Sequence, residues 1–492
     1  DRGTAHLASR NNALLGTISV PGETRIKVLG SIINAAGGSA VNTGNLILEA
    51  AQGGIGAGLN PATGTSYPTL SLSLRPGSTF TARAQAGVDV EFDGTALIDT
   101  VYSPQNVRLV TANGSLLNAN NDTLINILGT NVVLQASGTI GSATHALNVG
   151  NSLGGNITAN ATGLINLFGS AGHSFVIAQA NSITGSVKLT AALEAIIDGS
   201  VSAAGAVDMA AGTRLVISGV STVTSSTGAI AVDAGSLKMI NGATLTAATG
   251  RVLITTDDDA LVTGITAGAG DAGGVSAVTI VAGGRVYGGT APADRVDITA
   301  MASGASVSIT AGLGIGDRTQ ANERWQDGTG DVPGSANAVT DVANPLRILT
   351  ATMTFEALGG GIHAHALADD VLVRARALDG DIALVAAGHF ESPELEAIKG
   401  SISVDAEGNI VLADVVAGTD PDATKGAITI RSFGGSIDVA TATSGGSQIF
   451  EAVDDISFAT LRALGLPDDI GDVWLTSSEG ALRGGDIFAN GS

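Results

Sequence analysis

A short pattern returns along this chain, in which apolar and polar residues alternate between glycines. It reads Gly, polar, Ile or Val, polar, Leu or Val, polar, Ala, and is clearest at 44–50, 185–191, 380–386, 408–413, 426–432 and 435–441. Alternation over five or six positions is the period of a half-buried β-strand, and the glycines supply the turns. One such unit cannot bury its own apolar face, but many units stacked along an axis can. The repeat therefore predicts a stacked structure.

The predicted strands follow one another at intervals of about ten to twenty residues, which fits a coil of two or three short strands per turn. We therefore expect an all-β chain, with residues 1–492 forming one continuous β-solenoid, a single elongated rod with almost no α-helix. Aperiodic polar stretches interrupt the pattern. They predict loop insertions at about 57–69, 317–345, 417–426 and 463–472.

The composition suits a narrow core and excludes several kinds of chemistry. Hydrophobic residues make up 44% of the chain but aromatic residues only 3%, so small aliphatic side chains must fill the interior. The net charge of −22 argues against nucleic acid as a partner, because a phosphate backbone is bound by clustered Lys and Arg. Cysteine is absent, which excludes disulfide and thiol chemistry. We also expect no transmembrane segment, because no apolar run reaches the roughly 18 residues that a span requires.

The two ends of the sequence lie within repeat-like segments, without a recognisable signal peptide or polar cap. A solenoid with bare ends exposes strand edges, and natural solenoids are capped. We therefore expect these 492 residues to be either a piece of a longer protein or a subunit joined end to end with other copies or flanking segments.

A longer unit repeats three times. Ile55-Gly56, Ile140-Gly141 and Ile315-Gly316 are each followed by a polar gap, a strand-like run, and a Thr- and Ala-rich run that ends near a glycine. This unit, which reads Asn-Pro-Leu-Arg-Ile at 344–348, and repeats such as 380–386 resemble the shaft of filamentous haemagglutinin-like exoproteins. These are giant Gram-negative surface proteins that are secreted through a partner outer-membrane pore.

The resemblance covers most of the chain and implies a right-handed parallel β-helix. It also implies two-partner secretion, a place outside the cell or on the bacterial cell surface, and a role in adhesion or matrix building. A receptor or glycan on a host or neighbouring cell would then be the partner. The family's N-terminal secretion domain is not recognisable here, nor is a C-terminal toxin or anchor. An Arg-Gly-Asp tripeptide is absent, since Arg483-Gly-Gly-Asp486 is one residue too long.

Enzyme motifs need a separate check, because parallel β-helices also serve as polysaccharide lyases and hydrolases. Hydrolases of this fold resemble one another in an Asp-Asp pair, a Gly-His-Gly and an Arg-Ile-Lys, in that order, and use paired carboxylates as acid and base. Arg25-Ile26-Lys27 precedes every Asp-Asp pair, and the Gly-His candidates at 172–174 and 388–390 lack the second glycine. We therefore expect no catalytic residues, and we expect Arg25 and Lys27 to face solvent from a strand.

Metal ligands are equally sparse. The acidic runs at 257–259, 369–370, 454–455 and 468–469 offer oxygen ligands, and 268–274 resembles one calcium-binding nonapeptide without its tandem partner. His363 and His365 share one face of a strand but have no evident third ligand. We expect no cofactor and no ordered metal site, with weak calcium binding by acidic turns as the alternative.

The aperiodic stretch at 317–345 is the candidate contact site. It holds Trp325 among Arg318, Arg324, Asp327 and Asp331, and an exposed aromatic residue beside arginines suits contact with a protein or sugar. The alternative is a loop that folds back and packs Trp325 on the rod. Long aperiodic loops are uncommon in compact folds unless they are functional or mobile.

Two classes of function follow from these observations. The first is a structural shaft of a secreted bacterial surface adhesin or extracellular filament, which supplies reach and stiffness and performs no chemistry. The second is a carbohydrate-active or glycan-binding β-helix protein, which would need a cleft lined by carboxylates and aromatic residues. The low aromatic content and the lack of a clustered catalytic set favour the shaft.

Overall fold

The structure is a computed structural model that describes residues 3–35, 41–56, 69–120, 122–240, 242–271, 275–289, 296–300, 302–316, 345–424, 426–465 and 471–490. The chain divides into two compact units, residues 1–235 (the first unit) and residues 236–492 (the second unit). The described residues form β-strands and contain no helix.

Short strands run through the first unit, and the last of them, β24, extends past residue 235 into the second unit. These strands are β1 (Ala5–Ser9), β2 (Ala13–Leu15), β3 (Ile18–Val20), β4 (Thr24–Val28), β5 (Ile32–Asn34), β6 (Val41–Thr43), β7 (Leu46–Ala50), β8 (Leu70–Leu74), β9 (Thr79–Ala84), β10 (Val88–Phe92), β11 (Ala96–Tyr102), β12 (Val107–Thr111), β13 (Leu116–Asn118), β14 (Ile127–Gly129), β15 (Val132–Ala136), β16 (Leu147–Asn151), β17 (Ile157–Ala161), β18 (Ile165–Gly169), β19 (Val176–Ser182), β20 (Val187–Ala191), β21 (Glu194–Ala203), β22 (Val207–Ile217), β23 (Thr222–Ser225) and β24 (Ile230–Met239).

The second unit continues in the same style. Its strands are β25 (Thr244–Ala247), β26 (Val252–Thr256), β27 (Ala260–Val262), β28 (Ile265–Ala267), β29 (Val278–Ala282), β30 (Arg285–Gly288), β31 (Ile298–Ala300), β32 (Ser306–Ala311), β33 (Gly314–Ile315), β34 (Leu346–Leu349), β35 (Thr352–Ala357), β36 (Ile362–Ala366), β37 (Asp370–Ala377), β38 (Ile382–Ala386), β39 (His389–Ala397), β40 (Ile402–Ala406), β41 (Ile410–Ala417), β42 (Ile428–Ser432), β43 (Ile437–Ser444), β44 (Gln448–Ala452), β45 (Ile456–Ala463), β46 (Val473–Ser477) and β47 (Leu482–Ala489).

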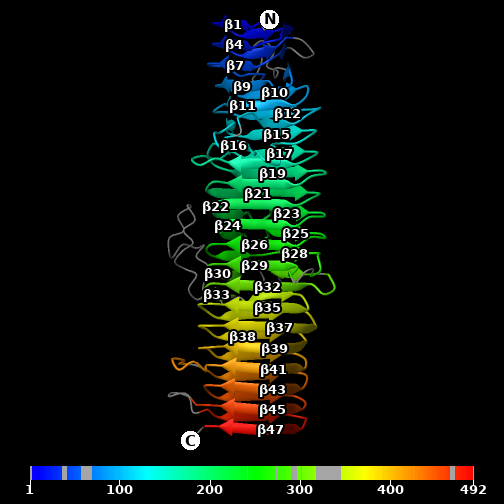
Figure 1. The fold of residues 1–492 in the computed structure, drawn as a ribbon, viewed down its shortest axis with the longest axis vertical. Helices are drawn as coiled ribbons and strands as arrows, with labels where there is room; N and C mark the ends of the chain where they lie inside the picture. The colour runs from blue at the N-terminus through cyan, green and yellow to red at the C-terminus, as the bar shows by residue number, and fades with distance from the viewer. Residues whose placement is uncertain are drawn as a thin grey trace. The chain divides into compact units, whose positions relative to one another are not determined.

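Each unit is a β-solenoid in which a strand pairs in parallel with strands of the coils before and after it. In the first unit β12, β15, β17 and β19 form one such series. In the second unit β35, β37, β39, β41, β43, β45 and β47 form another, and β36, β38, β40, β42, β44 and β46 a third. Within each unit the strands therefore lie one above the next, as Figure 1 shows.

These findings confirm the expected all-β, parallel β-solenoid fold. Whether residues 1–492 form one continuous solenoid stays a prediction. Of the expected insertions, residues 57–68, 317–344 and 466–470 lie outside the described part of the chain. Residues 418–424, between β41 and β42, hold no strand.

The core of the second unit lies where the alternation predicts it. Eight inward positions expected from the pattern are at most 4% exposed: Ile382, Leu384, Ile410, Leu412, Ile428, Ile430, Ile437 and Val439. Identical positions of successive coils face one another, as where Ile382 pairs with Ile402 and Ile402 with Ile428. Each aliphatic side chain is thus covered by the coils above and below, which removes it from water without a wide core.

The alanine that ends each repeat occupies the last inward position of its strand. Ala366, Ala386 and Ala406 stack in register at the ends of β36, β38 and β40 and are at most 5% exposed. Where a serine takes this position, its hydroxyl group bonds a turn carbonyl, as Ser432 Oγ does with the carbonyl oxygen of Gly408 at 2.8 Å. The position therefore accepts only small side chains, and a polar one must be satisfied locally.

The residue before a strand often bonds the same position of the next coil. The backbone N–H of Ser401 donates to Asp381 Oδ1 at 2.8 Å, and that of Ala427 donates to Ser401 Oγ at 3.1 Å. Asn409 accepts from the N–H of Ser436 in the same way, at 2.8 Å. We call this series the turn ladder. It satisfies backbone donors at turns, where strand pairing cannot do so.

The repeated Ile-Gly pair also has a structural basis. Ile55, Ile140 and Ile315 are fully buried, and the glycines that follow them have φ values of 60°, 71° and 70°. A side chain at these glycines would collide with the carbonyl oxygen of another coil. The pair therefore marks a tight left-handed turn that only glycine accommodates.

Candidate functional site

The predicted contact residues Arg318, Arg324, Trp325, Asp327 and Asp331 lie outside the described residues. The contact site therefore stays a prediction. The remaining candidates that the structure describes are exposed or half-buried side chains on strands and turns.

Arg25 and Lys27 occupy the two outward positions of β4, whose neighbours Thr24, Ile26 and Val28 are buried. Each basic side chain forms an ion pair: Arg25 Nη2 lies 3.6 Å from Glu23 Oε1, and Lys27 Nζ lies 2.9 Å from Glu49 Oε1. Arg25 and Lys27 therefore face solvent from a strand, as the sequence predicts.

His363 and His365 both point outward from β36, as predicted. His365 lies opposite Arg347 of β34 in the strand register. Burial, with a smaller effect of the Arg347 charge, lowers the pKa of His365 below its usual value. A neighbouring guanidinium also opposes a bound cation. Among the described residues no group of three or more His, Cys, Asp or Glu side chains is arranged to hold a metal ion.

Two of the acidic runs each place one carboxylate at a turn. Asp259 Oδ1 accepts a hydrogen bond from the N–H of Arg285 at 2.7 Å, and Asp455 Oδ1 accepts one from the N–H of Ala481 at 2.7 Å. Both carboxylates are therefore members of the turn ladder. Residues 468–469 lie outside the described part of the chain.

Asp271, in the stretch that resembles a calcium-binding nonapeptide, has a similar role. Its Oδ1 accepts from the N–H groups of Ala277 at 3.1 Å and Ser306 at 2.9 Å, and its Oδ2 accepts from Ser306 Oγ at 2.6 Å. These bonds join the segment before β29 to the start of β32. Residues 272–274 of the same stretch lie outside the described residues.

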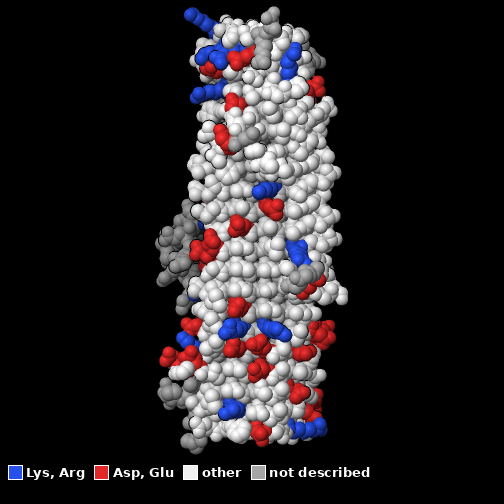
Figure 2. Space-filling view, in the orientation of Figure 1, with Lys and Arg blue, Asp and Glu red and all other residues white. Residues whose placement is uncertain are grey.

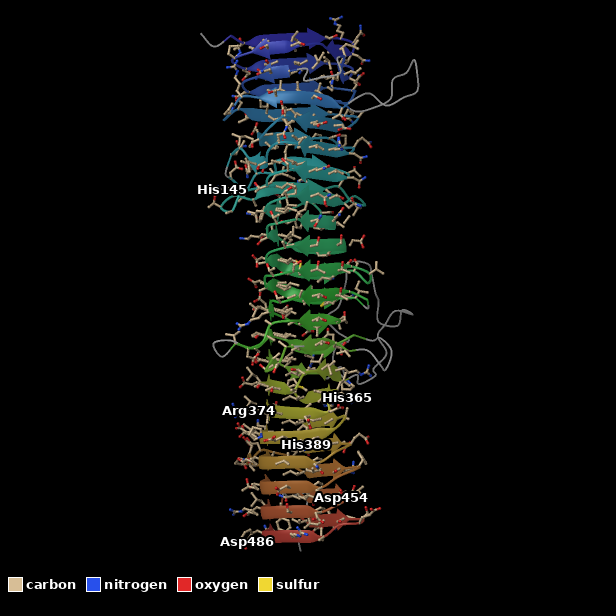
Figure 3. The ribbon with its side chains drawn as sticks, turned by 90° about the vertical axis from the view of Figure 1, so that its right-hand side faces the viewer. His145, His365, Arg374, His389, Asp454 and Asp486 are labelled. Carbon is tan, nitrogen blue, oxygen red and sulfur yellow. The ribbon has the colours of Figure 1, made fainter. Side chains whose placement is uncertain are left out.

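The third histidine of the second unit, His389, is the first residue of β39. His389 donates its backbone N–H to the carbonyl oxygen of Asp369 at 2.6 Å, and its Nδ1 lies 2.8 Å from the carbonyl oxygen of Asn409. Figure 3 shows that His365, His389 and Asp454 leave the stack at separate levels. These three side chains do not converge on one point.

Charged ladders across coils are the feature that sequence reasoning missed. Arg376 Nε donates to Glu396 Oε2 at 2.6 Å, while Arg376 Nη1 lies 3.7 Å from Glu356 Oε1. The hydrogen bond to Glu396, more than its charge, raises the pKa of Arg376. Arg431 Nε donates to Glu451 Oε2 at 2.9 Å on another face. The signal that could have revealed them is opposite charge at matching strand positions 20 residues apart.

No protein-family model, curated protein or solved structure matches this chain. None of the described residues forms a helix long and apolar enough to cross a membrane.

Proposed function

We propose that this chain is a shaft segment of a secreted bacterial surface adhesin or extracellular filament, of the filamentous haemagglutinin-like kind. Its work in this proposal is mechanical, and no residue performs chemistry. The segment sets the distance between an attachment point and whatever binds a receptor, glycan or neighbouring filament, and it acts outside the cell or on its surface.

One observation carries the proposal: successive coils of a unit repeat the same contacts. Along β38, β40, β42 and β44, residues Ile382, Ile402, Ile428 and Gln448 hold one register position in turn. Strands pair about 4.8 Å apart, so each added coil lengthens such a stack by about that amount. Nearest-neighbour contacts of this kind allow a protein to grow in one direction without a larger core.

The proposal is tested by displaying the chain on a bacterial surface, between a known outer-membrane anchor and a known binding module. Cells should attach to a ligand-coated surface at distances that an anchor with the binding module alone does not reach. A displayed globular domain of similar mass, placed in the same position, is the matched control. Attachment that is no better than with the globular control would count against the shaft.

A further inference from the structure

A row of arginines and a row of glutamates lie side by side on the outer face of the second unit. Arg374 and Arg376 are the exposed outward residues near the end of β37, while Glu394 and Glu396 face outward near the end of β39. The strand register places Arg374 beside Glu394 and Arg376 beside Glu396. Figure 2 shows basic side chains over β37 directly above acidic side chains over β39.

Only half of this set is paired within the chain. Arg376 bonds Glu396 and lies near Glu356. Arg374 and Glu394 are both exposed and form no ion pair with any described residue. Figure 3 shows Arg374 at the edge of the stack. An exposed arginine and an exposed glutamate at one register position are therefore open to partners outside the chain.

The two rows are self-complementary under a two-fold rotation. Let the axis run parallel to the strands, midway between β37 and β39, in the plane of contact. The rotation exchanges the two rows but keeps each position along the strand. Arg374 of one copy then faces Glu394 of the other, Arg376 faces Glu396, and the reciprocal contacts form at the same time.

We propose that this face binds a second copy of the chain, with the second units of the two copies side by side and their stacks antiparallel. The inference rests on the proposed function, which it deepens by naming one partner. Two shafts joined in this way would associate laterally, as a filament or matrix requires.

The strands that flank β37 and β39 on the same face fit the same arrangement. The register places Glu356 of β35 beside Arg376, and Val416 of β41 beside Glu396, so Glu356 of one copy faces Val416 of the other. One coil further out, Thr310 of β32 faces Thr443 of β43 by the same rule. These flanking contacts place no like charges opposite one another, a juxtaposition that would oppose association.

Exposed ion pairs are individually weak, but here the four central pairs form together and extend an existing network. Their attraction is screened by salt, since the Debye length falls from about 10 Å at 0.1 M ionic strength to about 3 Å at 1 M. Self-association of the intact chain should therefore be strongest at low ionic strength.

The experiment is sedimentation velocity of the full chain over a range of protein and salt concentrations. The unaltered chain should dimerise at low salt and dissociate as salt rises. Arg374→Glu alone and Glu394→Arg alone each place like charges opposite one another at two contacts. Each should weaken dimerisation about tenfold or more, because like-charge contacts at an interface are strongly unfavourable.

Mixing the two variants is the decisive arm. In a mixed pair one copy carries Glu at both positions and the other carries Arg at both, so every contact is again between opposite charges. The equimolar mixture should recover dimerisation that neither variant shows alone. Glu407→Arg is the matched control, because Glu407 is an exposed residue of the turn between β40 and β41 and lies outside β37 and β39. It should leave dimerisation unchanged.

Circular dichroism establishes whether each variant is folded. If a charge-reversal variant does not fold, the neutral variant Arg374→Gln or Glu394→Gln replaces it. A chain that stays monomeric at low salt overturns the inference, as does dimerisation that the variants do not weaken. Weakened variants whose mixture does not recover would also overturn it, because the facing geometry would then be wrong. A monomeric chain that still extends the reach of displayed cells would leave the shaft proposal standing.

Discussion

Ile410 and Val411 are neighbours in the sequence but lie on opposite faces of β41. Ile410 is fully buried between Phe390 and Ile437 of the adjacent coils, whereas Val411 is 37% exposed. Replacing Ile410 by Asp should lower the free energy of unfolding by about 3 kcal/mol or more, because the carboxylate would be buried without a partner. Urea denaturation at neutral pH measures this loss.

Val411→Asp is the matched control for that substitution. It introduces the same charge one residue away, on the solvent side, and should change the free energy of unfolding by about 0.5 kcal/mol or less. Equal losses in the two variants would show that the inward face of β41 is wrongly assigned.

Ala386 illustrates a constraint on size. It is 1% exposed and lies between Ala366 and Ala406 at the ends of stacked strands. Ala386→Leu should cost about 1–3 kcal/mol, because the added atoms must displace packed neighbours. Val385, which is 41% exposed, provides the comparison. Val385→Leu should leave the free energy of unfolding nearly unchanged when both variants are measured by thermal or urea unfolding. A neutral Ala386→Leu would show that the strand end has spare room.

His365 should make stability depend on pH. Burial and the Arg347 charge lower its pKa in the folded protein, so the unfolded chain binds more protons as the pH falls through the ordinary histidine range. The free energy of unfolding should therefore decrease below about pH 6.5 and recover above it. His365→Gln should reduce this slope in urea titrations between pH 5 and pH 8, whereas His363→Gln on the same strand should leave it in place. An unchanged slope in His365→Gln would contradict the assignment.

At the scale of elements, the turn ladder is the simplest feature to test. Asn409 Oδ1 accepts the N–H of Ser436, at the turns that precede β41 and β43. Asn409→Ala should lower the free energy of unfolding by about 1 kcal/mol, because it leaves that donor without its acceptor. Asn409→Asp keeps an oxygen at the same place and should lose much less in the same unfolding measurement. Similar losses in both would mean that the hydrogen bond contributes little.

The alternation in the sequence predicted the strands and the direction of their side chains, because burial of one face imposes a period of two. It did not predict which strands pair. The offset between bonded positions of neighbouring coils varies: it is 19 residues for Arg108 and Asp89, 26 for Ala427 and Ser401, and 50 for Arg347 and Asp297. Register therefore depends on turn lengths that the repeat does not specify. The charged ladders were missed for the same reason, since their members are adjacent only once the register is known.

At the scale of the whole molecule, the sequence predicted the solenoid but placed the contact site in the stretch 317–345, of which residues 317–344 lie outside the described part of the chain. The glycine-bounded repeat predicted the stack, and a composition that is 44% hydrophobic with 3% aromatic residues suits a core of small side chains. A contact surface has no such signature. Arg374 and Arg376 lie beside Glu394 and Glu396 only because β37 and β39, which are separate in the sequence, stack in register.

Stacking also predicts which deletions the chain tolerates. In the middle of the second unit the coil offset is 20 residues on two faces at once: Ile382 pairs with Ile402, and Phe390 with Ile410. Removing residues 388–407 takes out β39 and β40 together and joins Ala387 to Gly408. The strands on either side then meet in their original register, with β38 against β42 and β37 against β41. Since each coil contacts only its neighbours, the shortened chain should remain folded.

Removing residues 388–397 is the control, because it takes out β39 alone and leaves half a coil. The remaining strands of that coil would then have no partner at the correct position, and inward side chains would meet turns. The full-coil deletion should keep a β-sheet circular dichroism spectrum and one cooperative unfolding transition, while the half-coil deletion should lose cooperativity or fail to fold. If the full-coil deletion also loses cooperativity or fails to fold, the coils of this unit are not interchangeable, and its stability depends on contacts beyond nearest neighbours.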